Sequence, residues 1–361
     1  VTFGDNSQLT SIGAEAFYYC SSLASVTFGD NSQLTSIGSD AFSGCSSLKS
    51  ITIPSSVTSI GSYAFDGCSS LKSITIPSSV TSIGSDAFYG CSSLTGVYVS
   101  SLSSWVNIDF YNSYSNPLYY AKNLYVNNTK LTKLTANNLS GIKTINSYVF
   151  RSWNGTDVTI PSSVTSIGEY AFNDCSSLTG VYVSSLSSWV NIDFYNSYSN
   201  PLYYAKNLYV NNTKLTKLTA NNLSGIKTIN SYVFSGWNGT DVTIPSSVTS
   251  IGSSAFEYCS SLTSVTFNNP NGWGAYSNSS GTGTGTACDF SSTDKSGNAT
   301  KLTSTYKSRY LFRNMETETT TLPKVHYVGA DGQILQSVEV SSGTTITPSS
   351  KYTGTPPSKS G

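Results

Sequence analysis

Residues 71–93 read LKSITIPSSVTSIGSDAFYGCSS, and residues 48–70, directly before them, read LKSITIPSSVTSIGSYAFDGCSS. The two stretches differ at two of 23 positions. A tandem repeat of this length is typical of a solenoid, in which each coil buries its apolar face against its neighbours. The chain of 361 residues is therefore not expected to divide into two or three compact domains, as its length alone would suggest.

One repeat predicts the course of one coil. Ile74 and Ile76 point inward from a short strand, because alternate residues of a strand face opposite sides. Pro77 ends that strand, since proline has no backbone N–H to give to a neighbour. The opposing wall of the core is expected from the apolar residues of the return segment, Val80, Ile83, Ala87 and Phe88.

The same pattern can be followed to Phe267. A Phe that follows Ala or Val marks each copy, and alignment on this Phe predicts eleven stacked strands. At about 4.8 Å per step they form one parallel sheet roughly 50 Å long. The expected inward pairs are Val1/Phe3, Val26/Phe28, Ile51/Ile53, Ile74/Ile76, Val97/Val99, Leu134/Ala136, Val158/Ile160, Val181/Val183, Leu218/Ala220, Val242/Ile244 and Val265/Phe267.

A second, longer repeat lies within the first. Residues 92–175 and 176–259 are two blocks of 84 residues that match at all but six positions. A tandem duplication of this kind favours a scaffold that tolerates changes of length over an enzyme built around a single site. The six pairs are Arg151/Ser235, Ser152/Gly236, Glu169/Ser253, Tyr170/Ser254, Asn173/Glu257 and Asp174/Tyr258.

The composition excludes several classes of function. Lys and Arg number 19, as do Asp and Glu, so the chain offers no basic surface for nucleic acid or an anionic membrane. His326 is the single histidine, and no phosphate-binding loop or paired-carboxylate motif is recognisable. We therefore expect no enzyme, and predict no catalytic residue, metal site or cofactor.

The cysteines follow the repeat. Six of the seven lie three residues after the marker Phe, and Trp153 or Trp237 takes that place in the other copies. A position that accepts Cys or Trp but no polar residue predicts a buried packing slot. Thiols in successive coils could stack closely enough for oxidation, although parallel side chains oppose a disulfide. The six cysteines are Cys20, Cys45, Cys68, Cys91, Cys175 and Cys259.

The run S-x-L-x-S-I-T-I-P-S-S-V-T-S-I-G-x-x-A-F-x-x-C-S-S-L resembles the BspA-type leucine-rich repeats of bacterial surface proteins. The resemblance covers residues 1–267. It implies an extracellular, cell-wall-associated protein that binds host or bacterial surface components. Adhesion in that family is attached to the array as a whole, so the resemblance assigns no individual binding residue.

Each block carries a spacer, first seen at residues 100–128, SSLSSWVNIDFYNSYSNPLYYAKNLYVNN. Leu102, Trp105, Val106 and Phe110 recur at helical spacing after serines that can cap, which predicts a short helix in place of the usual return segment. Residues 124–134 predict a hairpin that turns at Asn127-Asn128. The spacer tyrosines either seal a bulged coil or form contact patches for protein or glycan. The candidates are Tyr111, Tyr114, Tyr195 and Tyr198.

The outward face of the predicted sheet is the second candidate site. Its residues are mostly Thr and Ser, but each block adds a Tyr, a Lys and an Asp. Two copies of one weak site about 15 Å apart would suit a multivalent ligand, while the alternative is an ordinary solvated sheet face. The residues are Tyr98, Lys133 and Asp157, repeated as Tyr182, Lys217 and Asp241, and possible glycosylation sites are Asn127, Asn211, Asn154 and Asn238.

Three segments are expected along the chain: a solenoid over 1–267, a cap and Gly/Ser/Thr-rich linker over 268–323, and a partial small β module with a polar tail over 324–361. Trp273 is expected to close the core, and residues 301–313 could add an edge strand. The β module resembles the start of a β-grasp unit, with two strands around Asp331-Gly332. The chain begins inside a strand without Met, so we expect it to be a piece of a longer protein.

The sequence therefore predicts a mainly β leucine-rich-repeat solenoid with little helix. The expected function is extracellular adhesion or recognition at a bacterial cell surface, with a protein or polysaccharide as partner and no membrane insertion. The alternative is a structural spacer, or a self-associating subunit of a surface fibre with no specific small ligand. Light scattering separates the two, because filaments that form with protein concentration and without ligand favour assembly.

Overall fold

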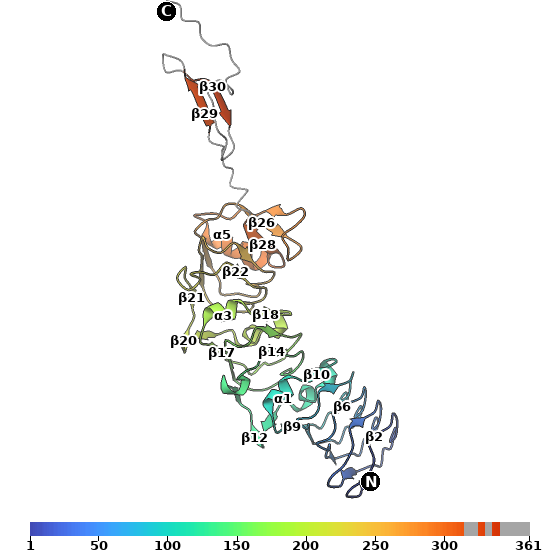
Figure 1. Ribbon diagram of the computed structural model, residues 1–361. Coiled ribbons are helices and arrows are strands. Elements are labelled where there is room, and N and C mark those ends of the chain that lie inside the picture. The colour runs from blue at the N-terminus through green and yellow to red at the C-terminus, as the bar shows by residue number, and fades with distance from the viewer. Residues whose placement is uncertain (314–323, 329–333, 340–361) are drawn as a thin grey trace, which may run out of the picture.

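The computed structural model describes residues 1–313, 324–328 and 334–339. Figure 1 shows residues 1–313 as a curved stack of coils that runs from β2 near the N-terminus to the elements around β26. Most coils contain one strand on a broad face, a second short strand on the return side, and a turn that carries the marker Phe. This is the mainly β, helix-poor solenoid that the repeat predicts.

The broad face, which we call the strand face, is built from parallel strands in matching register. Val26 pairs with Ile51, for example, and Val158 with Val181. The strands are β1 (Thr2–Phe3), β3 (Ser25–Phe28), β5 (Ser50–Ile51), β7 (Ser73–Thr75), β9 (Gly96–Val99), β11 (Leu124–Val126), β13 (Lys133–Leu134), β15 (Asp157–Ile160), β17 (Gly180–Val183), β19 (Leu208–Val210), β21 (Lys217–Leu218), β23 (Asp241–Ile244) and β25 (Ser264–Phe267).

The strand face is not the single continuous sheet that we expected. It consists of sheets of three, four, five and three strands, and a bridge between Thr52 and Thr75 joins the first two. The breaks come from two hairpins, in which β11 and β19 turn back into the antiparallel strands β12 (Thr129–Lys130) and β20 (Thr213–Lys214). The predicted turn at Asn127-Asn128 is confirmed, but β11 and β19 are additional parallel strands that the repeat alignment misses.

The return side carries a second series of parallel strands, each only two residues long, that the sequence does not predict. Serine and isoleucine alternate there, as in the pairing of Ser59 with Ser82 and of Ile60 with Ile83. Nine strands form this series: β2 (Ser11–Ile12), β4 (Ser36–Ile37), β6 (Ser59–Ile60), β8 (Ser82–Ile83), β10 (Asp109–Phe110), β14 (Thr144–Ile145), β16 (Ser166–Ile167), β18 (Asp193–Phe194), β22 (Thr228–Ile229), while β24 (Ser250–Ile251) continues it beside β22.

The core between these strands is a column of stacked side chains. The ring centroids of Phe42 and Phe65 lie 5.5 Å apart, and those of Phe65 and Phe88 lie 5.3 Å apart. The predicted inward residues are buried in most coils, including Ile74 and Ile76. The exceptions are Val1, Phe3 and Phe28 at the N-terminal end, and Ala136 and Ala220, which follow β13 and β21 and lie outside any strand.

The spacers add the helices of the solenoid. Helix α1 (Leu102–Val106) begins where Ser101 accepts a hydrogen bond from the Ser104 backbone N–H, as the capping serines predict. Phe110 does not belong to this helix but lies on β10, so the spacer keeps its return strand. The remaining helical elements of the two spacers and the coils after them are η1 (Ser113–Ser115), α2 (Leu118–Ala121), η2 (Asn137–Leu139), α3 (Leu186–Val190), η3 (Ser197–Ser199) and α4 (Leu202–Ala205).

The last coil is covered by a compact cap. Trp273 is buried against Phe267 and Phe290, at centroid distances of 5.5 and 6.3 Å, which confirms its predicted role. Of the predicted edge strand over 301–313, only residues 310–313 form a strand, while residues 301–305 are helical. The cap contains β26 (Trp273–Tyr276), β27 (Thr286–Ala287), α5 (Lys295–Thr300), η4 (Lys301–Thr305) and β28 (Tyr310–Arg313), which pairs antiparallel with β24.

Two further strands are described after the cap. Strands β29 (Lys324–Val328) and β30 (Ile334–Glu339) pair antiparallel, as the two predicted strands should. A β-grasp module is not shown. The turn at Asp331-Gly332, the linker over 314–323 and the polar tail over 340–361 lie outside the described residues.

Candidate binding faces

An ion pair stands on the strand face once in each block. Lys133 and Asp157 are register partners on β13 and β15, and Lys133 Nζ lies 3.1 Å from a carboxylate oxygen of Asp157. In the second block the same atoms of Lys217 and Asp241 are 3.3 Å apart. The lysine side chains are 66% and 63% exposed, whereas Asp157 is only 16% exposed, so the lysines are the members of the pairs that a ligand can reach most easily. Ion pairs that are open to solvent contribute only about 0–1 kcal/mol to stability.

Stacked tyrosines stand on the same face. Tyr98 on β9 stacks on Tyr125 on β11, and Tyr182 on β17 stacks on Tyr209 on β19, each pair with ring centroids 4.5 Å apart. The ring of Tyr182 lies so close over Gly180 that a Cβ there would approach it to 2.9 Å. Each stack is thus a broad, fixed, amphipathic surface, which can contact a partner with little loss of side-chain entropy.

The structure brings the first ion pair together with the second tyrosine stack. Asp157 pairs in register with Gly180 on β17, two residues before Tyr182, and the Tyr182 hydroxyl helps to lower the pKa of Asp157. Burial by itself raises the pKa of Asp157, but hydrogen bonds from Thr156 and Lys133 outweigh it and hold that pKa below its usual value. Asp157 therefore stays ionised. We call the group of Lys133, Asp157, Tyr182 and Tyr209 the junction row, because it joins residues of both blocks.

The other strand-face candidates form partial copies of this row. Tyr98 lies in the sheet of β7, β9 and β11, apart from the sheet that contains Lys133 and Asp157. In the junction row Asp157 pairs with Gly180 on β17, the strand that carries Tyr182. Asp241 pairs instead with Ser264 on β25, a strand without tyrosine. The two blocks therefore supply one complete row and two incomplete ones, and not two equal sites.

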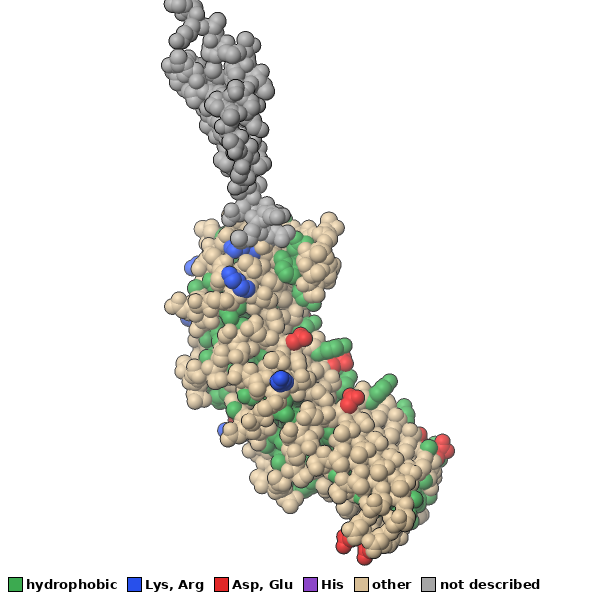
Figure 2. All heavy atoms as spheres, in the orientation of Figure 1, with side chains coloured by type: hydrophobic (Ala, Val, Ile, Leu, Met, Phe, Trp, Pro, Cys, Tyr) green, Lys and Arg blue, Asp and Glu red, His purple; other side chains and the backbone are tan. Residues whose placement is uncertain are grey.

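Tyrosines also gather on the side of the stack that carries the Phe turns. Rings at centroid distances of 4.7–5.8 Å link neighbouring coils there, and we call them the tyrosine band. Tyr114 and Tyr198 belong to it and are half-buried, whereas Tyr111 and Tyr195 stand outside it, 74% and 64% exposed. Figure 2 shows a surface with few charges, from which single apolar side chains project. The band consists of Tyr89, Tyr114, Tyr119, Tyr120, Tyr148, Tyr170, Tyr198, Tyr203, Tyr204 and Tyr258.

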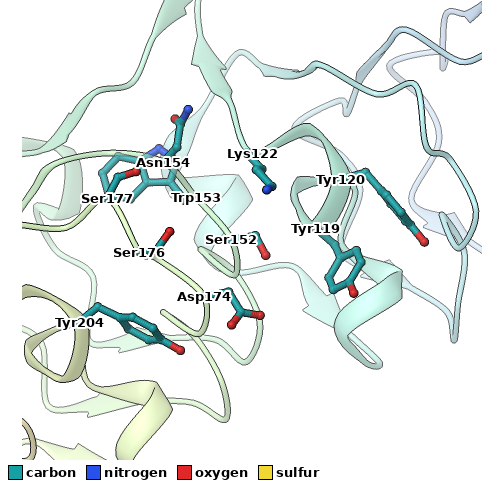
Figure 3. Close-up of a pocket in the computed structure, with 10 residues that line it drawn as sticks. All are labelled: Tyr119, Tyr120, Lys122, Ser152, Trp153, Asn154, Asp174, Ser176, Ser177 and Tyr204. Carbon is teal, nitrogen blue, oxygen red and sulfur yellow. The ribbon is translucent and has the colours of Figure 1, made fainter.

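The tyrosine band borders a hollow of about 790 Å³ between α2, the turn that contains Trp153, and α4. Figure 3 shows Lys122 and Tyr119 on one side of this hollow and Tyr204 on the other, with Asp174 between them. Sequence reasoning misses Lys122 and Asp174. The signal that could have found Asp174 is its place among the six positions at which the blocks differ.

The four possible glycosylation sites fall into two kinds. Asn127 and Asn211 are exposed at the hairpin turns. Asn154 donates its side-chain amide to the Asn123 side-chain oxygen at 2.8 Å, and Asn238 makes the same bond in the second block. Modification of Asn154 or Asn238 would remove that hydrogen bond, so the hairpin tips are the sites that a glycan could occupy without loss.

The buried cysteines have the packing role that their spacing predicts. Cys45, Cys68, Cys91, Cys175 and Cys259 are buried and free, and each thiol donates to the carbonyl oxygen of a Phe in the preceding coil at 3.0–3.2 Å. Burial raises the pKa of the Cys45 thiol to about 11 and that of Cys259 to about 12. These thiols stay protonated and are poor nucleophiles at neutral pH.

In residues 1–313, 324–328 and 334–339, no three of the side chains that the structure describes form a group of His, Cys, Asp or Glu that could hold a metal ion. No helix of the same ranges has the length and apolar character that crossing a lipid bilayer requires. The side chain of His326 lies outside what the structure describes.

A sequence profile described as "BspA type Leucine rich repeat region (6 copies)" matches residues 2–117, 121–209 and 204–280. The chain belongs to this family. The BspA-type profile thus covers both blocks and the start of the cap, and its coils are those that carry the strand face and the tyrosine band. No curated protein matches the sequence.

Solved structures similar to this BspA-type chain come from several bacteria. The leucine rich repeat protein of T. pallidum is 24% identical over 54% of this chain and 72% of its own, with a TM-score of 0.30. A leucine rich cell surface protein from Faecalibacterium prausnitzii A2-165 is 20% identical over 75% and 88%, with a TM-score of 0.30. The pneumococcal vaccine antigen PcpA is 18% identical over 75% and 62%, with a TM-score of 0.32.

Proposed function

We propose that this chain is an extracellular recognition protein of a bacterial cell surface, which binds a protein or a glycan along its strand face. Its membership of the BspA-type family supports the location. The observation that carries the binding role is the junction row, where an ionised Asp157, its Lys133 partner and a stacked pair of tyrosines lie side by side on an otherwise Thr- and Ser-rich surface.

The junction row suits recognition because its side chains are already ordered. Tyr182 is held by the Tyr209 ring, and Asp157 by Thr156 and Lys133. Immobilising a free side chain on binding costs about 0.5–1.5 kcal/mol, and side chains that are already fixed avoid most of this cost. The partial copies at Tyr98 and at Lys217 flank the row, so an extended ligand could touch all three and gain avidity.

Binding to arrays of matrix proteins and glycans tests this function. The change is Tyr98→Ala with Tyr182→Ala, which opens both tyrosine stacks. We expect binding to fall at least about tenfold, since central aromatic contacts commonly contribute about 2 kcal/mol or more to an interface. Tyr195→Ala is the control, because this exposed tyrosine lies on the return side.

Unchanged binding by the double variant would remove the strand face from consideration. Light scattering on the same samples separates recognition from assembly. A monomer that binds its ligand supports the proposal, whereas filaments that form with concentration and ignore every ligand contradict it.

A further inference from the structure

The hollow beside the tyrosine band is a second site, on a different side of the stack from the junction row. Its walls come from three successive coils: Tyr119 and Lys122 around α2, Ser152 in the next turn, and Asp174 in the turn after that. Tyr204 of α4 closes it from the second spacer. Its volume of about 790 Å³ falls within the range of about 300–1,000 Å³ usual for ligand pockets.

One of the six differences between the blocks lies at this place. Ser152 corresponds to Gly236, and both have positive φ, of 60° and 80°. A Cβ at Gly236 would lie 2.9 Å from the Tyr203 Cα and 3.1 Å from the Lys206 Nζ, so in the second block the spacer helix packs too closely to admit one. In the first block Ser152 has a Cβ at the corresponding place and lines the hollow.

The charged groups are also arranged differently in the two blocks. Lys206 lies over the Tyr203 ring, with Nζ 4.8 Å from the centroid. In the first block the Arg151 guanidinium lies over the Tyr119 ring instead, with its Cζ 5.2 Å from the ring centroid. The same guanidinium forms an ion pair with Asp174, whose Oδ2 lies 3.1 Å from Arg151 Nη2. Lys122, the counterpart of Lys206, has no ion pair within the part of the chain that the structure describes, so its ammonium group can reach a ligand in the hollow.

Neighbouring structure accounts for some of the six differences. In the second block Glu257 and Ser254 contact Lys307 of the cap. The corresponding turn of the first block contacts the second spacer instead, where Asn173 accepts a hydrogen bond from Tyr204. The same spacer sequence precedes Ser152 and Gly236, but the coil that follows differs, because the Ser152 backbone N–H donates to the Asn173 carbonyl oxygen and that of Gly236 to the Glu257 carbonyl oxygen. Ser152 lines the hollow together with Asp174 of that following turn.

The lining suits a polyhydroxyl ligand. Tyrosine rings offer flat apolar surface, the Ser176 and Ser177 hydroxyls can donate or accept, Asp174 is 53% exposed and can accept, and Lys122 can donate. A pyranose sugar presents the matching set, with apolar C–H groups on one face and hydroxyls around its edge. Asp174 is already paired with Arg151, so the lining of the hollow offers no unpaired carboxylate to a cationic ligand.

We propose that this hollow binds a pyranose ring of a glycan. Lys122 and Asp174 hydrogen-bond the sugar hydroxyls, and Tyr119 and Tyr204 enclose the ring from opposite sides. The site goes beyond recognition on the strand face, because it uses other residues on another side of the solenoid.

The test exploits the duplicated block. Glycan arrays carrying neutral hexoses, N-acetylhexosamines, uronic acids and sialic acid, with a peptide array beside them, are followed by calorimetric titration of the best glycan. The main variant combines Arg151→Ser, Ser152→Gly and Asp174→Tyr, the residues of the second block, which occupy the same coil positions in this fold. The second variant is Lys122→Ala, and its matched control is Lys206→Ala.

We expect the triple variant and Lys122→Ala each to lose at least about tenfold in affinity, since each removes one or two hydrogen bonds from the site. Lys206→Ala and the variant with Tyr98→Ala and Tyr182→Ala should bind this glycan as the unaltered chain does. Three outcomes would overturn the proposal: no glycan bound, only peptides bound, or full affinity in the triple variant. Loss through the strand-face variant alone would assign the glycan to the junction row and leave the proposed function standing.

Discussion

At the scale of single residues, one slot three positions after the marker Phe shows how the coil selects its side chains. A thiol fits the slot because it is small and apolar, and because it donates weakly to the carbonyl group of the preceding coil. Cys20 occupies the same slot in the first coil that the structure describes, and there it is exposed. Position in the stack, and not residue type, therefore decides the reactivity of each thiol.

We expect alkylation in native buffer to modify Cys20 first. The five buried cysteines should react only after unfolding, because burial excludes the reagent and keeps the thiol protonated. Peptide mass spectrometry after a short exposure to iodoacetamide measures this directly, with a sample in guanidinium as the control for complete labelling. Rapid native labelling of Cys68 would contradict the packing.

The raised thiol pKa values also predict a loss of stability in alkali. The unfolded chain releases these protons near the ordinary value of 9.0, whereas folded Cys259 holds its proton to about 12. Because the folded pKa is the higher one, the free energy of unfolding is unaffected below pH 9 and falls as the pH rises toward 12. The free energy of unfolding, measured with denaturant at several pH values just above 9, should fall less steeply with pH for Cys259→Ala than for the unaltered chain. Equal slopes would show that this thiol ionises in the folded state.

The glycine at 236 and the serine at 152 give a matched pair of substitutions. Gly236→Ser should destabilise the chain by about 1–3 kcal/mol, because the new Cβ meets the Tyr203 backbone at 2.9 Å. Ser152→Gly should change stability by less than about 1 kcal/mol, since glycine adopts the positive φ of that turn readily. Guanidinium unfolding measures both. Equal changes in the free energy of unfolding for the two variants would mean that both turns leave the same space for a Cβ atom.

At the scale of elements, the hairpins decide where the strand face is interrupted. Strand β11 pairs with β9 in the regular parallel register and then turns back, so β12 ends that sheet and β13 begins the next. Asn127 and Asn128 allow this because both have positive φ, of 48° and 61°, as a two-residue hairpin turn requires.

Asn128→Val should therefore destabilise the hairpin by about 1–2 kcal/mol, because a β-branched residue fits the left-handed region poorly. Asn128→Gly should leave stability unchanged or slightly higher. Hydrogen exchange of the amides in β11 and β12 is the measurement, and Asn212→Val in the second hairpin provides an internal repeat of the result. A loss of protection in distant coils, but not in the hairpin, would contradict this assignment.

The sequence predicts some elements well and others poorly, for physical reasons. Ile74 and Ile76 alternate with a polar residue along a strand, and that period is visible. A return strand such as Ser82–Ile83 is two residues long, too short for any period to show. The junction row is hidden for another reason: β15 of the first block pairs with β17 of the second, which carries Tyr182, while the sequence groups Asp157 with Tyr98 of its own block.

At the scale of the whole molecule, the stack behaves as a chain of neighbours. Residues 92–175 can be removed without creating a new kind of contact. Residue 91 is then followed by residue 176, which repeats residue 92, so the coils at the new junction have the same neighbours as before. The turn at 253–258 also keeps its contacts with Lys307 of the cap. Stability in such arrays is close to a sum of coil and interface terms.

We therefore expect the chain without 92–175 to fold, with a denaturant m-value that falls roughly in proportion to the coils removed. Removal of 176–259 instead brings Asn173 and Asp174 against the cap and loses the contact between Glu257 and Lys307, so this chain should be the less stable of the two. Circular dichroism with guanidinium unfolding compares them at equal length. A shorter chain of the first kind that fails to fold would show long-range coupling in the stack.

The junction row has a consequence for how such a protein changes over time. Its ion pair comes from one copy of the block and its tyrosines from the next copy, so the number of complete rows is one less than the number of copies. A gene with a single copy encodes none, and each later duplication adds one without any point mutation. Slippage during replication would thus raise or lower the number of complete rows in single steps, and strains that differ in block number would differ in the number of complete rows.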